Sequence, residues 1–156
     1  MNTARRFVLS AWVLGLASRV QAAPALPYDE AADARADLNR ALQQARSEHK
    51  QVLVVFGANW CPDCRDLALK MATGSLASHV GRHFIVTKVD VARFNKNTDL
   101  AQQMGNPIRM GIPAVAVLRA DGSLVKATTG GELADARNMG ESEILKLLQG
   151  MSSSAP

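Results

Sequence analysis

The stretch Val52–Asp66, VLVVFGANWCPDCRD, decides the fold and contains both cysteines of the chain. Its first part, Val52–Phe56, is a continuous apolar run, which is typical of a strand buried on both faces near the centre of a parallel or mixed sheet. Pro62 suits the first position of a helix, because its φ is already helical and its missing N–H costs nothing there. We therefore predict a strand-to-helix junction after Gly57, with Cys61 as the helix N-cap.

This position of Cys61 favours chemistry over simple cross-linking. The positive end of a helix and its free N–H groups lower the pKa of a thiol, and the thiolate is the nucleophile in disulfide exchange. Cys64 follows one turn later, so we expect an exposed attacking thiol at Cys61 with a more buried thiol behind it. A bridge this short stabilises little, because the gain from a disulfide grows with the length of the loop that it closes.

The rest of the chain alternates helical and strand patterns, in the order α-β-α-β-α-β-β-α. This order predicts one α/β domain over residues 25–150, without repeats, and a disordered tail at 151–156. The last helix is expected to stop at Gly150, and residues 106–113 are expected to form a loop. The other strands are predicted at Phe84–Val91 and, as a hairpin around Asp121-Gly122, at Ala114–Leu118 and Leu124–Thr128.

Residues 33–149 resemble the thioredoxin superfamily, and in particular exported bacterial thioredoxin-like proteins. The resemblance is carried by VLVVFGANWCPDCRDL, the later GIPAVAVL and the α/β order. It implies a thioredoxin-like fold, a central mixed β-sheet of about four strands flanked by helices. It also implies that Cys61 attacks substrate disulfides, that Cys64 resolves the mixed disulfide, and that the two form a redox-active Cys61–Cys64 bridge.

Further site residues follow from the same resemblance. Trp60 matches a tryptophan beside the site, Pro113 a proline that is cis in this fold, and Ile112 the residue that pairs with substrate backbone. The plainer alternatives are a core tryptophan at Trp60 and an ordinary trans proline at Pro113. Two positions depart from thioredoxins. Val55 replaces a buried proton-transferring aspartate, and Gly57 replaces a tryptophan.

The loss of that aspartate leaves its proton-transfer role open. Lys88 matches a lysine that lies behind the site in the family, so it is a candidate for proton-transfer support. Asp63, between the cysteines, adds a negative charge. At about 7 Å in a water-like dielectric, its repulsion of a Cys61 thiolate is about 0.6 kcal/mol. This predicts a Cys61 pKa that is only moderately depressed and a weakly oxidising disulfide, unless Asp63 is simply an acid at a helix start.

A metal site is the other chemistry that two cysteines allow. With the two cysteines, His79 and His83 have the composition of a Cys₂His₂ zinc site. Gly81 weakens a helix between the histidines, and nothing in the resemblance brings them to the cysteines. We therefore expect no metal, and no organic cofactor.

The N-terminus has the pattern of a secretory signal peptide over residues 1–22. Arg5 and Arg6 precede an apolar run at 7–17, which is shorter than the about 20 residues of a membrane span; an uncleaved anchor is the alternative. Three of the 18 basic residues lie in this segment, so the remainder has 15 basic and 14 acidic residues, a net charge of +1. This balance argues against a nucleic-acid partner.

Together these features predict a periplasmic or secreted thiol-disulfide oxidoreductase without stable membrane insertion after cleavage. We expect a monomer that reduces disulfide-containing proteins and takes electrons from a membrane thiol carrier. The alternative is a non-enzymatic binding, chaperone-like or metallochaperone module that uses the cysteines as ligands. The loop at 130–141, GGELADARNMGE, either borders the site or merely turns the chain.

Overall fold

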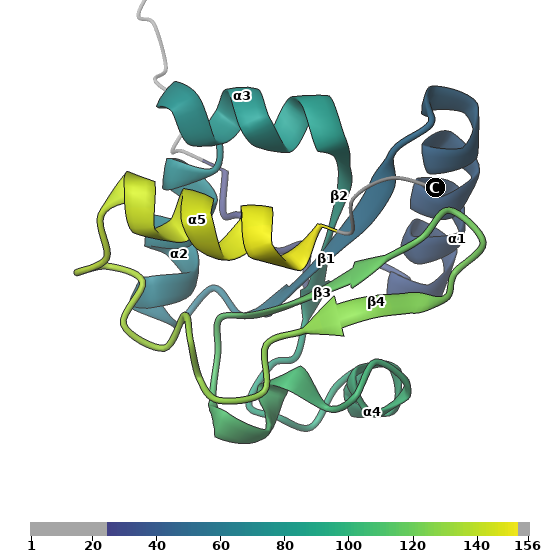
Figure 1. Cartoon of the computed structure of the whole chain (residues 1–156). Coiled ribbons are helices and arrows are strands. Elements are labelled where there is room, and N and C mark those ends of the chain that lie inside the picture. Colours follow the sequence, from purple (N-terminus) through teal and green to yellow (C-terminus); the bar gives the residue numbers. More distant parts are fainter. Residues whose placement is uncertain (1–24, 153–156) are drawn as a thin grey trace, which may run out of the picture.

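The computed structural model describes residues 25–152 and contains a four-stranded sheet in the order β2-β1-β3-β4 (Figure 1). The central strand β1 (Gln51–Gly57) is parallel to β2 (Phe84–Asp90) and antiparallel to β3 (Ala114–Leu118). β4 (Leu124–Ala127) is antiparallel to β3 and forms the second edge. The predicted mixed sheet of a thioredoxin-like α/β fold is therefore confirmed.

Helices cover both faces of this sheet. Asp33 is the N-cap of α1 (Ala34–Glu48), and its carboxylate accepts hydrogen bonds from the backbone N–H groups of Arg35 and Ala36; the C-cap is His49, in the left-handed conformation. In the described part of the chain the α-helices are α1 (Ala34–Glu48), α2 (Pro62–Lys70), α3 (Gly74–His83), α4 (Thr98–Gln103) and α5 (Glu141–Met151).

Alternate residues of β1 belong to two different cores, which explains its unbroken apolar run. Val54 and Phe56 pack in a core with residues of α1 and α4. Leu53 and Val55 pack in a second core with residues of α2, α3 and α5. A strand with helices on both faces has no solvent-facing side, so every position of its interior favours an apolar residue.

The structure corrects several of the predicted elements. The last helix does not stop at Gly150 but continues to Met151, which is 3% exposed, because burial of this methionine outweighs the low helix propensity of glycine. The first residue of the predicted tail, Met151, therefore belongs to this helix. Residues 107–110 form a short 3₁₀ helix in place of a loop. β2 ends at Asp90 rather than Val91, and β4 ends at Ala127 rather than Thr128.

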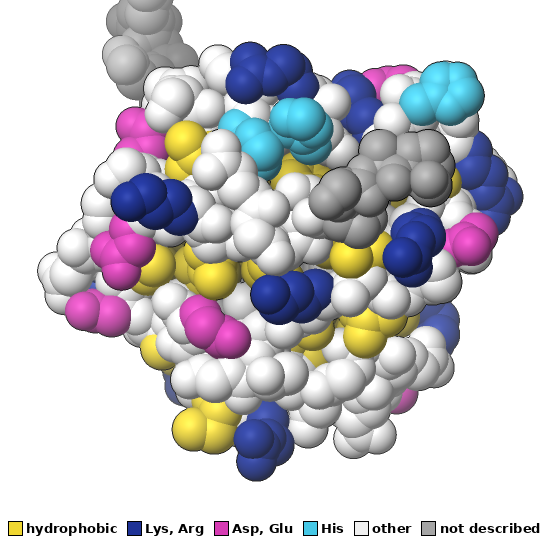
Figure 2. Space-filling model, viewed as in Figure 1, with side chains coloured by type: hydrophobic (Ala, Val, Ile, Leu, Met, Phe, Trp, Pro, Cys, Tyr) yellow, Lys and Arg dark blue, Asp and Glu magenta, His cyan; other side chains and the backbone are white. Residues whose placement is uncertain are grey.

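The described surface has no strong charge asymmetry on the side shown in Figure 2, where basic and acidic side chains are interspersed. No helix within residues 25–152 has the length and apolar character needed to cross a membrane. The predicted signal peptide, residues 1–22, lies outside the described residues.

Candidate active site around Cys61 and Cys64

The two cysteines lie at the start of α2, as the sequence predicted. Cys61 is the N-cap with an extended backbone, and Pro62 occupies the first turn. The Sγ atom of Cys61 accepts a hydrogen bond from the backbone N–H of Cys64 at 3.2 Å. The same N–H group is therefore placed to stabilise a thiolate at Cys61 after reduction.

The cysteines form the Cys61–Cys64 disulfide, with their Cα atoms 5.3 Å apart. Cys64 is fully buried, as expected, but Cys61 is only 4% exposed, so the prediction of an exposed attacking sulfur is wrong for this bridged state. The reason is the loop before β3, whose Ile112 carbonyl oxygen lies 3.6 Å from the Sγ atom of Cys61. The Ile112–Pro113 peptide bond is cis, as the family resemblance implied.

Trp60 forms an exposed aromatic surface next to the bridge. Its side chain is 46% exposed, and its Nε1–H donates to the Ala92 carbonyl oxygen at 2.7 Å. The ring meets Phe94 edge to face at 6.5 Å between centroids, and the guanidinium of Arg93 lies 5.4 Å from its centre. The alternative of a core tryptophan is therefore wrong.

The loop after β2 that supports Trp60 was missed by sequence reasoning. Ala92, Phe94 and Asn97 all have positive φ, which is uncommon for residues other than glycine. Phe94 remains 43% exposed in this strained loop. Strained backbone is frequent at functional sites. In the sequence, the one feature that points to this loop is Phe94, a single aromatic residue within the polar run that follows the strand.

Tyr28 fills the space left by the glycine at position 57. A Cβ atom built on Gly57 would collide with the Oη and Cζ atoms of Tyr28 and lie 3.0 Å from its Cε1. The side chain of Asn59 holds the backbone of Tyr28. Its Oδ1 atom accepts a hydrogen bond from the Tyr28 N–H at 3.0 Å, and its Nδ2 atom donates to the Tyr28 carbonyl oxygen at 2.8 Å. Burial, and then the charge of Asp90, raise the pKa of the Tyr28 hydroxyl. The departure at Gly57 thus has a structural reason.

Asp63 does not face the cysteines as a free charge. Its Oδ1 atom accepts hydrogen bonds from the backbone N–H of Arg137 at 3.0 Å and from the Arg137 side-chain Nε at 3.1 Å. Burial raises the pKa of Asp63, but these bonds and the positive charge of Arg137 outweigh burial, so its net pKa is lowered. The loop that contains Arg137 therefore contacts the Cys-Pro-Asp-Cys segment.

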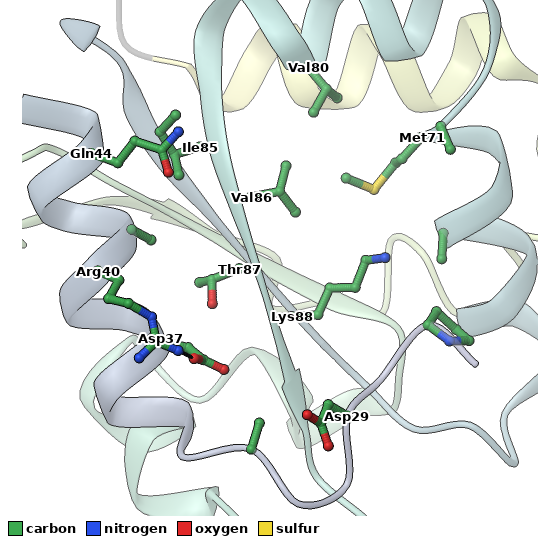
Figure 3. Close-up of a pocket in the computed structure, with 15 residues that line it drawn as sticks. Asp29, Asp37, Arg40, Gln44, Met71, Val80, Ile85, Val86, Thr87 and Lys88 are labelled. Atoms are coloured by element: carbon green, nitrogen blue, oxygen red, sulfur yellow. Dashed lines mark hydrogen bonds and ion pairs between the residues drawn. The ribbon is translucent and has the colours of Figure 1, made fainter. Parts of the chain in front are cut away.

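Lys88 lies on β2, the second strand, and pairs with Val55 of β1. It lines a groove of about 560 Å³ along β2, between α1 and α2, on the same side of the strand as Met71 (Figure 3). Burial lowers the pKa of Lys88. Neither cysteine lines this groove, so support of proton transfer by Lys88 stays a prediction.

His79 and His83, the histidines of the Cys₂His₂ alternative, lie on α3. The rings of His79 and His83 are 4.5 Å apart, and His79 also packs against Phe84. Within residues 25–152, no group of three or more His, Cys, Asp and Glu side chains is placed to hold a metal ion. Burial, and then the charges of His83 and Arg82, lower the pKa of His79.

Comparison with known proteins agrees with this geometry. Among solved structures, the chain is similar to the disulphide isomerase of Xylella fastidiosa Temecula1, at 43% sequence identity and a TM-score of 0.79; the match covers 83% of this chain and 98% of that chain. It shares a fold with the oxidised C-terminal domain of DsbD from Neisseria meningitidis, at 21% identity and a TM-score of 0.56, covering 78% and 97%.

A thioredoxin from Thermus thermophilus also shares the fold, at 22% identity and a TM-score of 0.52, with 71% of this chain and 80% of that chain covered. No curated protein sequence matches the chain. A family model described as thioredoxin-like matches residues 33–120, which is more than half of the 156 residues. Sheet order, cysteine geometry and this match together show that the chain belongs to the thioredoxin-like family.

Proposed function

We propose that the protein is a thiol-disulfide oxidoreductase that exchanges disulfides with other proteins through Cys61 and Cys64. The observation that carries this proposal is the bridge at the N-terminus of α2, with one sulfur at the N-cap and the other buried behind it. A relative with 43% identity that is described as a disulphide isomerase supports the same class of chemistry.

The reaction proceeds in two exchange steps. The Cys61 thiolate attacks one sulfur of a substrate disulfide, which forms a Cys61–substrate disulfide and releases the other substrate sulfur as a thiolate. Cys64, deprotonated, then attacks the Sγ atom of Cys61. The Cys61–Cys64 bridge forms, and the second substrate sulfur leaves as a thiolate that takes up a proton. A thiol carrier then donates two electrons, which reduce the Cys61–Cys64 bridge back to two thiols.

The surface around the bridge fits an extended protein substrate. Trp60, Phe94 and Met110 are three of the large apolar side chains that are exposed in the described part of the chain. Trp60 directly precedes Cys61, and Phe94 contacts Trp60. We infer that these side chains hold apolar residues beside the substrate disulfide, while the backbone of Ile112 pairs with substrate backbone.

Phe94→Ala is expected to raise the KM for insulin reduction about five- to tenfold, because part of an aromatic contact area is lost. Rates with a small disulfide such as oxidised glutathione should change less than about twofold, since that substrate does not span the surface. Leu124→Ala is the matched control, because Leu124 has a similar exposure of 40% but lies on β4. Equal KM values for both variants would refute a role of Phe94 in substrate binding.

We also propose a redox direction and a cellular compartment for this reaction. We infer a monomer in the periplasm or outside the cell, which reduces disulfides with electrons from a membrane thiol carrier. The signal-like N-terminal sequence supports export. The negative charge of Asp63 beside Cys61, although reduced by its pairing with Arg137, favours the reducing direction. Insulin reduction with dithiothreitol tests the activity, and stoichiometric metal uptake without turnover would favour the alternative of a metallochaperone.

A further inference from the structure

The negative charge between the two cysteines is paired with a residue far along the chain. Asp63 and Arg137 are separated by 74 residues in sequence, yet two hydrogen bonds join them. The Asp63 side chain is 14% exposed and that of Arg137 is 53% exposed. The other carboxylate on this face of α2, Asp66, is paired with Lys70 at 2.7 Å. Both acids next to the redox centre therefore have a cationic partner.

The loop that contains Arg137 is held in place by contacts that do not depend on the Arg137 side chain. Lys70 Nζ donates to three of its carbonyl oxygens, those of Ala136, Arg137 and Met139, at 2.8–3.0 Å. Leu133 and Ala136 are fully buried in the core. The backbone N–H of Arg137 remains a donor to Asp63 whatever the side chain is. Substitution of Arg137 should therefore change a charge and leave the loop in position.

Reduction of the bridge creates negative charge at Cys61, two residues before Asp63 and on the same first turn of α2. An uncompensated carboxylate at this position repels the thiolate and disfavours the reduced state. A carboxylate that is paired with a guanidinium repels it much less, because the two charges largely cancel at Cys61.

We propose that Arg137 is a positioning residue of the redox centre, which acts through Asp63 by compensating its charge and so stabilises the reduced, thiolate state of Cys61. This inference rests on the proposed function, since it concerns the regulation of the same site. It gives the 130–140 loop a role in setting the redox equilibrium, beyond turning the chain between β4 and α5.

The proposal predicts opposite signs for the two partners. Arg137→Gln removes the positive charge beside Asp63, and the surroundings of Asp63 and Cys61 are less polarisable than water because both are largely buried. The equilibrium with glutathione therefore shifts toward the disulfide by about three- to tenfold. That fold-change corresponds to a reduction potential about 15–30 mV more negative. Asp63→Asn leaves Arg137 without its partner and shifts the equilibrium toward the dithiol. The double variant, with both charges removed, returns close to the wild type.

The test is a redox titration of the full chain in glutathione buffers, with wild type, the two single variants and the double variant compared at pH 7. Arg137→Lys should restore most of the wild-type value, and 1 M salt should shrink every shift, because Arg137 is largely exposed. Arg119→Gln is the matched control, since Arg119 follows the end of β3 that is remote from Pro113.

Two outcomes would overturn the proposal. One is an Arg137→Gln equilibrium within twofold of wild type, and the other is a shift of the same sign for Arg137→Gln and Asp63→Asn, which would indicate a structural disturbance. The titration needs no protein substrate. A failure of the proposed oxidoreductase activity would instead show as absent insulin reduction while the Asp63 and Arg137 shifts persist.

Discussion

Replacing Cys61 with alanine is expected to abolish reduction of protein disulfides, a loss of at least about a thousandfold relative to wild type. The reason is that Cys61 is the sulfur at the N-cap of α2, where the backbone N–H of Cys64 stabilises its thiolate. Insulin turbidity in the presence of dithiothreitol measures this loss directly, with the uncatalysed reaction as the baseline.

Cys64→Ala should behave differently, because it retains the attacking sulfur and lacks the resolving one. The variant is expected to accumulate a mixed disulfide between Cys61 and the substrate, visible as a higher-mass species that dithiothreitol removes. A trapped complex in Cys61→Ala in place of Cys64→Ala would reverse the assigned roles. Wild-type turnover in Cys61→Ala would remove Cys61 from the mechanism.

Gly57→Ala is expected to lower the free energy of unfolding by about 2–3 kcal/mol, which is large for the addition of one methyl group. The added Cβ would overlap the Tyr28 ring, and this ring is buried and held by the two hydrogen bonds between Asn59 and the Tyr28 backbone. Chemical denaturation followed by circular dichroism measures the change.

The chain offers two controls for this clash. Gly81→Ala adds the same methyl group where nothing lies within 4 Å, on α3, and should be neutral or stabilising by up to about 1 kcal/mol. In a Tyr28→Ala background, Gly57→Ala should cost less than about 1 kcal/mol, because the colliding ring is gone. An equal cost of Gly57→Ala with and without Tyr28 would show that the ring is not its cause.

The fold and the two cysteines could be predicted because their signals are local. The apolar run of β1 reports burial on two faces, and Pro62 after Cys61 reports the start of a helix. The Asp121-Gly122 turn likewise predicted the β3–β4 hairpin, in which Gly122 has a φ of 92°.

The remaining features of the site depend on contacts between distant segments, which no local pattern reports. Trp60 and Ala92 are 32 residues apart, and Asp63 and Arg137 are 74 apart. The ring of Tyr28 occupies the space at Gly57 through the same kind of long-range packing. The low exposure of Cys61 also follows from a distant segment, since Ile112 covers its sulfur.

These contacts change how the acid between the cysteines is understood. As an isolated charge, Asp63 would repel the Cys61 thiolate and make the bridge a weak oxidant. Paired with Arg137, Asp63 repels the Cys61 thiolate less, and its hydrogen bonds to Arg137 join the 130–140 loop to α2. The helix N-terminus then remains the main influence on Cys61, without the additional positive charge that would make the disulfide a strong oxidant.

The most direct test of the central claim is the reduction potential of the wild-type Cys61–Cys64 pair. The account predicts a reversible two-electron transition with a midpoint nearer to about −270 mV, as for reducing thioredoxins, than to about −120 mV, as for strong oxidants. A midpoint near −120 mV would contradict the reducing direction. A midpoint below about −300 mV, or a bridge that cannot be reversibly reduced, would mark a structural disulfide and contradict the proposed function.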